Sequence, residues 1–293
     1  MSAQRYSTIL DTTTLEGSSF VDAGRLAEFI ARHPRLFVLT GAGCSTGSGI
    51  PDYRDMDGGW KRRPPVTLQA FVGDAKTRSR YWARSLVGWR RFGRAQPNGT
   101  HAAIAALERE GRVEVLLTQN VDGLHGAAGS ERTIDLHGRI DTVRCLACET
   151  RSPRAALQLE LRQRNPGWAA LEARTAPDGD ADLDGIDFST FDIPPCPVCG
   201  GMLKPDVVFF GESVPRERVQ AAYAALGEAD AVLVAGSSLM VYSGFRFVQA
   251  AVAAGKPVAA VNLGRTRADD LLALKVAQPV GDALTALAEQ LAA

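Results

Sequence analysis

Four of the five cysteines form two pairs whose spacing is typical of a metal site. Two residues separate Cys145 from Cys148, two separate Cys196 from Cys199, and two glycines follow the second pair. This spacing lets both thiolates of a pair face one ion, and four thiolates complete a tetrahedral zinc shell without an open position for a catalytic water. The pattern therefore predicts one structural Zn²⁺ ion, with a redox-active dithiol as the alternative.

A glycine-rich segment at residues 41–55 follows an apolar run and indicates a phosphate-binding turn. Gly41 and Gly43 suit a sharp turn and a close approach of the backbone to a pyrophosphate. Thr46 replaces the third glycine of the strict dinucleotide fingerprint, and no Gly-Lys-Ser/Thr of a P-loop follows. A flexible loop without a ligand is the alternative, and Cys44 is expected to be a small buried residue.

Short apolar runs, each followed by small polar residues, predict buried parallel strands. These runs lie at 36–40, 113–118, 231–235 and 257–261. Amphipathic helical patterns lie between and around them, at 23–33, 100–110, 216–226 and 283–291. Strands that alternate with helices predict an α/β fold with a doubly wound parallel sheet. Ligands of such sheets bind at the carboxyl ends of the strands, so the small polar residues there are candidate site residues.

The alternation stops between about Thr142 and Leu203, where the two cysteine pairs enclose a different kind of sequence. Within it, residues 177–195 hold six Asp and no Lys or Arg, which indicates a solvated acidic loop. We therefore predict an inserted zinc-binding module. The predicted division is an N-terminal extension at 1–22, a larger domain at 23–141 and 204–293, and the small module at 142–203.

Composition excludes several classes of protein. The chain has 293 residues, of which 45% are hydrophobic, and its 33 Lys and Arg balance 33 Asp and Glu. A net charge of zero argues against a nucleic-acid partner held by bulk charge. No apolar run approaches the roughly 20 residues of a membrane span, and the first residues lack the apolar core of a secretory signal. We expect a soluble cytoplasmic protein without membrane partners, in which thiols favour metal binding over disulfides.

Taken together, the motifs resemble those of the sirtuin family. Residues 41–54 are similar to its glycine-rich signature, and TQNVDGLH at 118–125 and LHG at 136–138 follow in the family's order. The two cysteine pairs, GSS at 236–238 and VN at 261–262 complete the set. The likeness covers about residues 25–290. The chain further resembles the class II subgroup, which contains mitochondrial sirtuin four. The likeness lies in RYWAR, QPN, the long insertion between the cysteine pairs and LKPDVVFFGE.

The resemblance implies a Rossmann-like larger domain, a smaller zinc-bearing one, and an acylated protein lysine that enters between them. The implied activity is NAD-dependent protein-lysine deacylation that releases nicotinamide and O-acyl-ADP-ribose. A mono-ADP-ribosyltransferase and a non-enzymatic zinc-bearing adaptor remain alternatives. A hydride-transferring oxidoreductase is disfavoured, because the implied chemistry consumes NAD. The sequence favours a monomer.

The resemblance also implies the roles of individual residues. His137 is the expected general base, which takes a proton from a ribose hydroxyl, since an imidazole titrates near working pH; a core histidine is the alternative. Asn120 is expected to contact ribose and Asp122 the nicotinamide carboxamide. The residues expected to contact NAD are Gly41, Ala42, Gly43, Ser45, Asp52, Tyr53, Arg54, Trp60, Gln119, Asn120, Val121, Asp122, Gly236, Ser237, Ser238, Asn262, Leu263, Gly264 and Val280.

Two segments resemble the strands between which sirtuins add the substrate backbone as a further strand. The residues expected to contact substrate are Val208, Phe209, Phe210, Gly211, Glu212, Tyr242 and Gly244. One of the two phenylalanines is expected to be ordinary core instead. The other histidines, His33, His101 and His125, are expected to be structural.

The sequence says less about the acyl group. Tyr81 and Arg84 have the spacing of a Tyr/Arg pair that recognises acidic acyl chains in desuccinylating sirtuins. The surrounding residues fit the class II subgroup better, with Trp82 and Trp89 as packing residues. The subgroup resemblance therefore implies a preference for bulkier or lipoyl-type acyl groups over acetyl.

Overall fold

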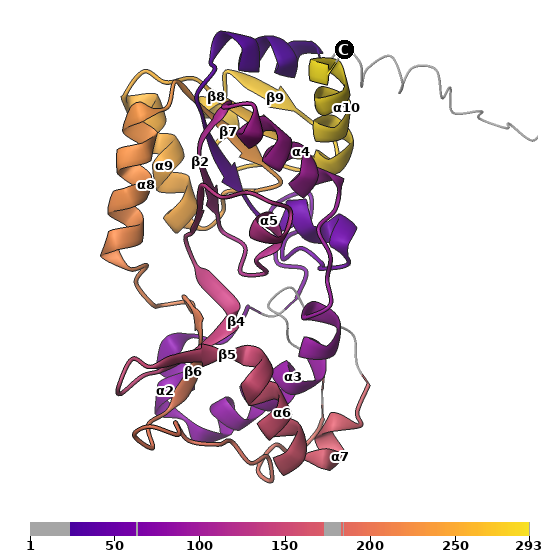
Figure 1. Cartoon of the computed structure of the whole chain (residues 1–293), viewed down its shortest axis with the longest axis vertical. Coiled ribbons are helices and arrows are strands. Elements are labelled where there is room, and N and C mark those ends of the chain that lie inside the picture. The colour runs from indigo at the N-terminus through magenta and orange to yellow at the C-terminus, as the bar shows by residue number, and fades with distance from the viewer. Residues whose placement is uncertain (1–23, 63, 173–182, 184, 293) are drawn as a thin grey trace, which may run out of the picture.

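The computed structural model describes residues 24–62, 64–172, 183 and 185–292 (Figure 1). The predicted N-terminal extension at 1–22 lies outside the described residues. So does part of the predicted acidic loop, at 177–182 and 184.

A six-stranded parallel sheet forms the centre of the large lobe, which is the upper part of Figure 1. Its strand order is β3-β2-β1-β7-β8-β9, with β1 paired in parallel to both β2 and β7. Every residue of β1 and β7 is buried, which explains why these strands read as unbroken apolar runs. The strands are β1 (Leu36–Thr40), β2 (Val113–Thr118), β3 (Thr133–Asp135), β7 (Ala231–Ala235), β8 (Val258–Val261) and β9 (Leu274–Val276).

Helices cover both faces of this sheet, so the predicted Rossmann-like, doubly wound architecture is confirmed (Figure 1). Along β1, Val38 joins the core on one face and Phe37 the core on the other, as expected for alternating side chains. The first face packs against residues 24–32, α4 (Gly99–Arg109) and α10 (Val280–Ala292), and the second against α8 (Arg216–Glu228) and α9 (Tyr242–Ala253).

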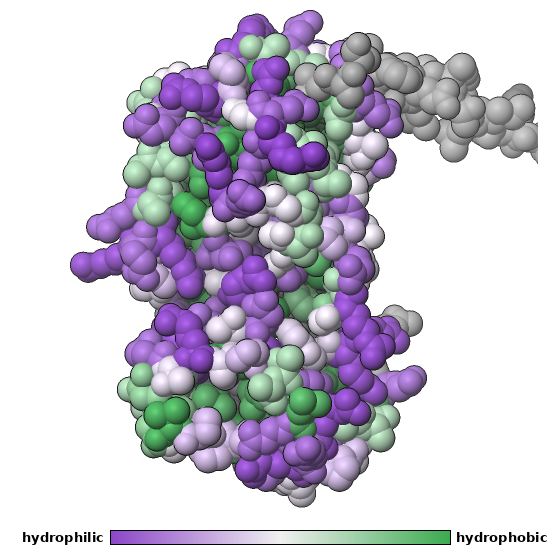
Figure 2. Space-filling view, viewed as in Figure 1, coloured by the Kyte–Doolittle hydropathy of each residue, from purple (hydrophilic) through white to green (hydrophobic). Residues whose placement is uncertain are grey.

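All four predicted strands and all four predicted helices of this lobe are present. The short strands β3 and β9 were not predicted, because three residues carry too little of a hydrophobic pattern. In the described part of the chain, no helix has both the length and the apolar character needed to cross a membrane. On the face shown in Figure 2, apolar side chains are exposed in small groups among hydrophilic ones.

The small lobe is built on a three-stranded antiparallel sheet with the order β5-β4-β6 (Figure 1). Its strands are β4 (Gly138–Cys145), β5 (Arg151–Pro153) and β6 (Leu203–Val207). Its helices are α2 (Leu68–Gly73), α3 (Ala75–Phe92), α6 (Arg154–Arg164) and α7 (Pro166–Ala169).

The placement of α2 and α3 differs from the predicted division of the chain, which assigned residues 68–92 to the larger domain. In the structure, Phe71 and Trp82 share a buried cluster with Val143 of β4 and Leu161 of α6. The buried guanidinium of Arg154 lies 5.4 Å from the ring centre of Trp82 and holds α6 against α3. The sequence carried no signal for this packing, because the partners lie about 60 residues or more apart along the chain.

Gly138, the first residue of β4, yields a test of how closely β4 packs against β6. Its φ is +82°, and a Cβ there would lie 2.0 Å from the carbonyl oxygen of Asp206 on β6. We expect Gly138→Ala to lower the free energy of unfolding by roughly 2 kcal/mol or more, since backbone strain and a backbone clash add. Chemical denaturation measures this.

Gly73→Ala is the matched control, because a Cβ at Gly73 meets nothing within 4 Å. This variant should keep or slightly raise stability. Equal stabilities of the two variants would contradict the packing described here.

Candidate active site

A cavity of about 970 Å³ lies between the lobes and is lined by residues from both. It opens at the carboxyl ends of β1, β2 and β7, where ligands of doubly wound sheets bind. Every residue predicted to contact NAD lines this cavity, as do His137 and six of the seven residues predicted to contact substrate. Residues that are spread over about 240 positions of the chain thus converge on one site. The site lies at the carboxyl edge of the sheet, as the sequence analysis predicted.

The glycines of the cavity allow the backbone of two strand ends to approach closely. Gly43 donates its N–H to the carbonyl of Gly236 over 2.8 Å, and a Cβ on Gly43 would lie 2.8 Å from the Gly236 Cα. A Cβ on Gly41 would lie 2.7 Å from Cβ of Ser237. Side chains at these positions would push the strand ends apart, so the pattern that suggested a pyrophosphate cradle has a physical cause.

Polar side chains at the ends of β1 and β2 form a hydrogen-bonded chain. Asn120 Nδ2 donates to Ser45 Oγ over 3.1 Å and to the Gly41 carbonyl over 3.1 Å. Ser45 Oγ in turn donates to Asp122 Oδ2 over 2.7 Å, and Asp122 Oδ1 accepts from the Leu124 N–H. The amide and the carboxylate are therefore held in fixed orientations beside each other on the cavity wall.

His137 occupies the connection between β3 and β4, where the chain passes from one lobe to the other. Its Nδ1 lies 2.9 Å from the Gln119 carbonyl oxygen, which can only accept, so Nδ1 carries the hydrogen. In the neutral ring Nε2 is then the acceptor, and it receives the Ser243 hydroxyl over 2.7 Å.

The ionisation state of His137 follows from its surroundings. Burial lowers the pKa of His137 to about 4; the bond to Gln119 opposes this shift, while Arg246 and Arg218 add to it. The ring is therefore neutral at pH 7, with Nε2 unprotonated and facing the cavity wall. This is the state that a general base requires before it accepts a proton.

The other three histidines have structural partners, as predicted. The rings of His101 and His125 are buried with centres 4.8 Å apart, and His125 Nε2 lies 3.0 Å from Thr40 Oγ1. Burial lowers the pKa of His125 to about 3, so it stays neutral. His33 Nδ1 bonds to the carbonyl of Phe29 one turn earlier.

Asn98 is a site residue whose role the sequence analysis missed. Its Nδ2 donates to the Cys44 carbonyl and to Ser48 Oγ, both over 2.9 Å, and its backbone N–H donates to His101 Nδ1. Asn98 thus ties the start of α4 to the short 3₁₀ helix η1 (Ala42–Ser48) of the glycine-rich segment. An Asn directly before a helix was the available signal, since such residues cap helices.

Aromatic and cationic side chains form the outer wall of the cavity. The Arg54 guanidinium lies 3.6 Å from the ring centre of Trp60, and Trp60 meets Phe210 edge-on at 5.7 Å. Desolvation lowers the pKa of Arg54, but the side chain stays cationic at pH 7. These contacts join the loop after η1 to the segment predicted to bind substrate.

The two predicted substrate segments differ from strands. β6 ends at Val207, and residues 208–212 continue as a turn with one isolated bridge, from Phe210 to Thr67. Phe209 is buried in the small-lobe core whereas Phe210 is 36% exposed, as expected for one of the pair. Tyr242 begins α9, so the expected second strand is wrong, and Tyr242 is exposed at the cavity.

Gly244 is the one predicted substrate residue that does not line the cavity. It is buried, and a Cβ there would lie 2.4 Å from Gln119 Oε1. Its physical role is therefore to let α9 approach the end of β2. This proximity places the neighbouring Ser243, which the sequence analysis did not single out, against His137.

A largely buried ion pair fastens the segment predicted to contact substrate to β6. The Lys204 ammonium is 1% exposed and lies 3.1 Å from Glu212 Oε2, which also accepts the Phe209 N–H over 2.9 Å. Burial lowers the pKa of Lys204, and the Glu212 carboxylate opposes this shift. The Glu212 carboxylate is partly exposed and also lies 3.6 Å from the Arg144 guanidinium, so the pair belongs to a small charged cluster.

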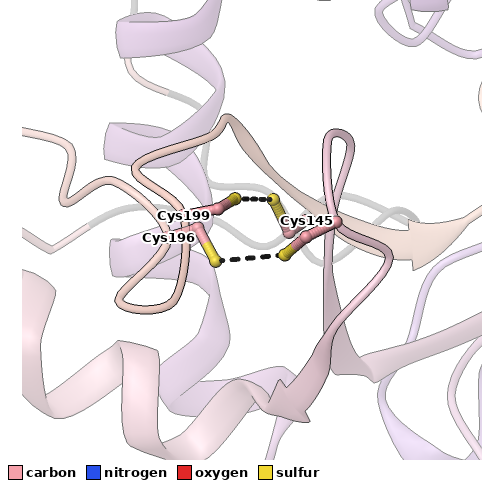
Figure 3. Close-up of side chains that lie close together, drawn as sticks. Cys145, Cys196 and Cys199 are labelled. Atoms are coloured by element: carbon pink, nitrogen blue, oxygen red, sulfur yellow. Dashed lines mark hydrogen bonds between the residues drawn. The ribbon is translucent and has the colours of Figure 1, made fainter.

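The four paired cysteines meet at one point of the small lobe (Figure 3). Their sulfurs all lie within 4.8 Å of one another, with Cys145 Sγ 3.5 Å from Cys199 Sγ and Cys148 Sγ 3.7 Å from Cys196 Sγ. Tetrahedral zinc with Zn–S bonds of about 2.3 Å requires sulfurs about 3.8 Å apart, so the set fits one Zn²⁺ ion. None of the four lines the cavity, which agrees with a structural role.

The fold and site define a Rossmann-like α/β protein with an inserted four-cysteine module, and comparisons with known proteins identify its family. A model described as the Sir2 family matches residues 41–243. The chain is 69% identical over 266 residues to an NAD-dependent protein deacetylase of Xanthomonas axonopodis pv. citri, which covers 91% of both chains. It is 64% identical to a protein of the same description from Bordetella bronchiseptica, over 91% of this chain and 97% of that one.

Comparison with solved structures identifies the same family. One, described as "Structural Basis for the Mechanism and Regulation of Sir2 Enzymes", has a TM-score of 0.73 at 31% identity, over 93% of this chain and 98% of the other. Another, "Sir2-p53 peptide-NAD+", has a TM-score of 0.72 at 27% identity, over 92% and 98%. The chain belongs to the Sir2 family. The predictions of a sirtuin and of an NAD-dependent protein deacetylase are thereby confirmed.

The cysteine cluster predicts how the protein responds to loss of one ligand. We expect the purified protein to hold about one zinc ion per chain and Cys148→Ser to lose it, because three thiolates bind zinc more weakly than four. The melting temperature should fall by about 5 °C or more. Elemental analysis and calorimetry measure the two quantities.

Cys44→Ser is the control, since Cys44 lies in the glycine-rich segment, where its thiol bonds to the Ala235 carbonyl. This variant should keep its zinc. Full zinc occupancy in Cys148→Ser would rule out the four-thiolate site.

Proposed function

We propose that this protein removes acyl groups from protein lysines with consumption of NAD, and that His137 is the base of the reaction. The observation that carries the proposal is the state of His137 in the cavity. Its Nδ1 hydrogen is fixed on Gln119, and its unprotonated Nε2 accepts the Ser243 hydroxyl. The Asn120–Ser45–Asp122 chain lines the same cavity.

NAD fits the large-lobe side of this cavity. Gly41, Gly43 and Ser237 line the cavity at the carboxyl ends of β1 and β7, where small residues let a pyrophosphate approach the backbone. We assign the phosphate contacts to Gly41–Gly43 and Ser237, and the adenosine end to Asn262, Leu263, Gly264 and Val280. When bound, NAD supplies a sugar carbon that becomes electrophilic as nicotinamide leaves.

The fixed polar chain suits the nicotinamide end of the ligand. Asp122 presents a carboxylate to amide hydrogens, and Asn120 presents an amide to a ribose hydroxyl. Because Ser45 and the backbone already fix both groups, they need no reorganisation when the ligand binds.

The lysine substrate is expected to enter between the lobes, along residues 208–210 and Tyr242. The buried Lys204–Glu212 pair holds this segment rigid, and the exposed Phe210 and Tyr242 offer apolar contacts. The solved relative described with a p53 peptide and NAD supports a peptide substrate. Backbone pairing would give affinity with little sequence preference.

We further propose that the chain belongs to the class II subgroup and prefers bulkier or lipoyl-type acyl groups. On the small-lobe side, Pro65, Val66, Tyr81 and Phe209 give the cavity an apolar wall, with the Tyr81 and Phe209 rings 5.2 Å apart. Arg84 does not line the cavity. An acidic acyl group would therefore lack the cation that the Tyr81–Arg84 spacing suggested.

Replacement of His137 tests the proposed base. His137→Ala should bind NAD within a few-fold of the wild type and lose about 10²–10⁴-fold in deacylation, because only the proton acceptor is removed. Titration calorimetry measures binding, and mass spectrometry should identify O-acyl-ADP-ribose as the wild-type product. Full activity of His137→Ala would remove His137 from this role, and transfer of labelled ADP-ribose to protein without deacylation would indicate a mono-ADP-ribosyltransferase.

A panel of peptides tests the acyl preference. We expect kcat/KM to be higher for lipoyl or long-chain lysine peptides than for acetyl, and lowest for succinyl, because the wall is apolar and a buried carboxylate would be unpaired. Arg84→Met is a matched control that should leave the succinyl-to-acetyl ratio unchanged. A clear preference for acetyl would reject the proposal.

A further inference from the structure

The Nε2 atom of His137 is already engaged in the structure. It has a single in-plane lone pair, and the Ser243 hydroxyl donates to it over 2.7 Å. The other ring nitrogen is committed to the Gln119 carbonyl. While Ser243 holds this position, a second hydroxyl cannot form a well-aligned hydrogen bond to Nε2. A substrate hydroxyl must therefore either displace Ser243 or pass its proton through it.

Ser243 is well placed for the second route. It is the second residue of α9 and lines the cavity, as His137 does. A serine hydroxyl has one hydrogen and two acceptor lone pairs. With the hydrogen directed at Nε2, the lone pairs can accept a hydrogen bond from a hydroxyl bound in the cavity.

We propose that Ser243 relays the proton from a substrate hydroxyl to His137, an inference that rests on the proposed role of His137 as the base. The substrate O–H bond breaks and its proton forms a new covalent bond to Ser243 Oγ. At the same time the original Oγ–H bond breaks, and that proton forms a covalent bond to His137 Nε2. Ser243 ends as a neutral hydroxyl and His137 as an imidazolium. The electron pair stays on the substrate oxygen, which becomes the nucleophile.

The surroundings of the ring favour its neutral form. Burial lowers the pKa of His137, and Arg246 on α9 and Arg218 on α8 add to this shift. Arg246 Nε also donates to the Ser243 carbonyl over 3.0 Å, which holds the first turn of α9 in place. The proposed relay therefore joins a hydroxyl on a fixed helix turn to a ring that is neutral at rest and can accept a proton.

The variants Ser243→Ala and Ser243→Thr test the relay by separating two steps of the reaction. Exchange of labelled nicotinamide into NAD, in the presence of an acylated peptide, reports the step before His137 accepts a proton. We expect Ser243→Ala to keep this exchange within about twofold and to lose about tenfold or more in deacylation kcat. Ser243→Thr, which retains a hydroxyl, should recover most of the loss.

Nuclear magnetic resonance of ¹⁵N-labelled histidine in the ligand-free protein gives a readout independent of activity. The Ser243 hydroxyl stabilises the neutral ring, so its removal should raise the pKa of His137 and shift the Nε2 resonance. The spectrum of His137→Ala assigns the signal. Ser243→Thr should titrate like the wild type.

Each outcome of these experiments supports or overturns the proposed relay. Wild-type turnover in Ser243→Ala would show that substrate reaches Nε2 directly, and faster turnover would show that Ser243 only blocks the base; both overturn the relay. A parallel fall of exchange and turnover would assign Ser243 a purely structural role, and an unchanged His137 resonance would show that the hydrogen bond is absent in solution. Failure of the proposed function itself is distinguishable, because His137→Ala would then remain active whatever Ser243→Ala does.

Discussion

The connection between β3 and β4 is the constraint on which the rest of the site depends. Leu136 N–H donates to the Thr118 carbonyl of the large sheet over 2.9 Å, and the His137 carbonyl accepts the Val208 N–H from the small lobe over 2.7 Å. Gly138 then turns the chain with a positive φ into β4. Hydrogen bonds to both lobes on either side of one imidazole leave its ring little freedom, so its partners are set by the backbone.

The two lobes give the cavity walls of different chemical character. The large lobe contributes close backbone approach and fixed dipoles, because its strand ends meet where glycines permit it. The small lobe contributes apolar surface and residues 208–212, which the Lys204–Glu212 pair holds in place. The four clustered cysteines lie in the small lobe, and none of them lines the cavity. Burial lowers the pKa of His137, which keeps the ring neutral at rest, as its proposed role as a base requires.

The features that sequence reasoning missed share one cause. The packing of α2 and α3 on the small lobe, the helical start at Tyr242 and the role of Gly244 all depend on contacts between segments distant in the chain. Gly244 is an example. The motif suggested a substrate contact, whereas in the structure the absence of a side chain at Gly244 leaves space for the Gln119 side chain. No sequence pattern marked Ser243, and its hydroxyl is recognised as a site group only because it donates to His137 in the folded protein.

The amino-acid sequence alone determined the parallel sheet, the cavity at its carboxyl edge, the cysteine cluster and the family, because these depend on local patterns. Continuous apolar runs specify buried strands, fixed cysteine spacing specifies a metal knuckle, and glycines mark close backbone approach. Only the tertiary structure decided the tautomer of His137, its low pKa and its bond to Ser243. Those properties arise from burial and from partners 18 and 106 residues away, and no local pattern encodes a distance across a fold.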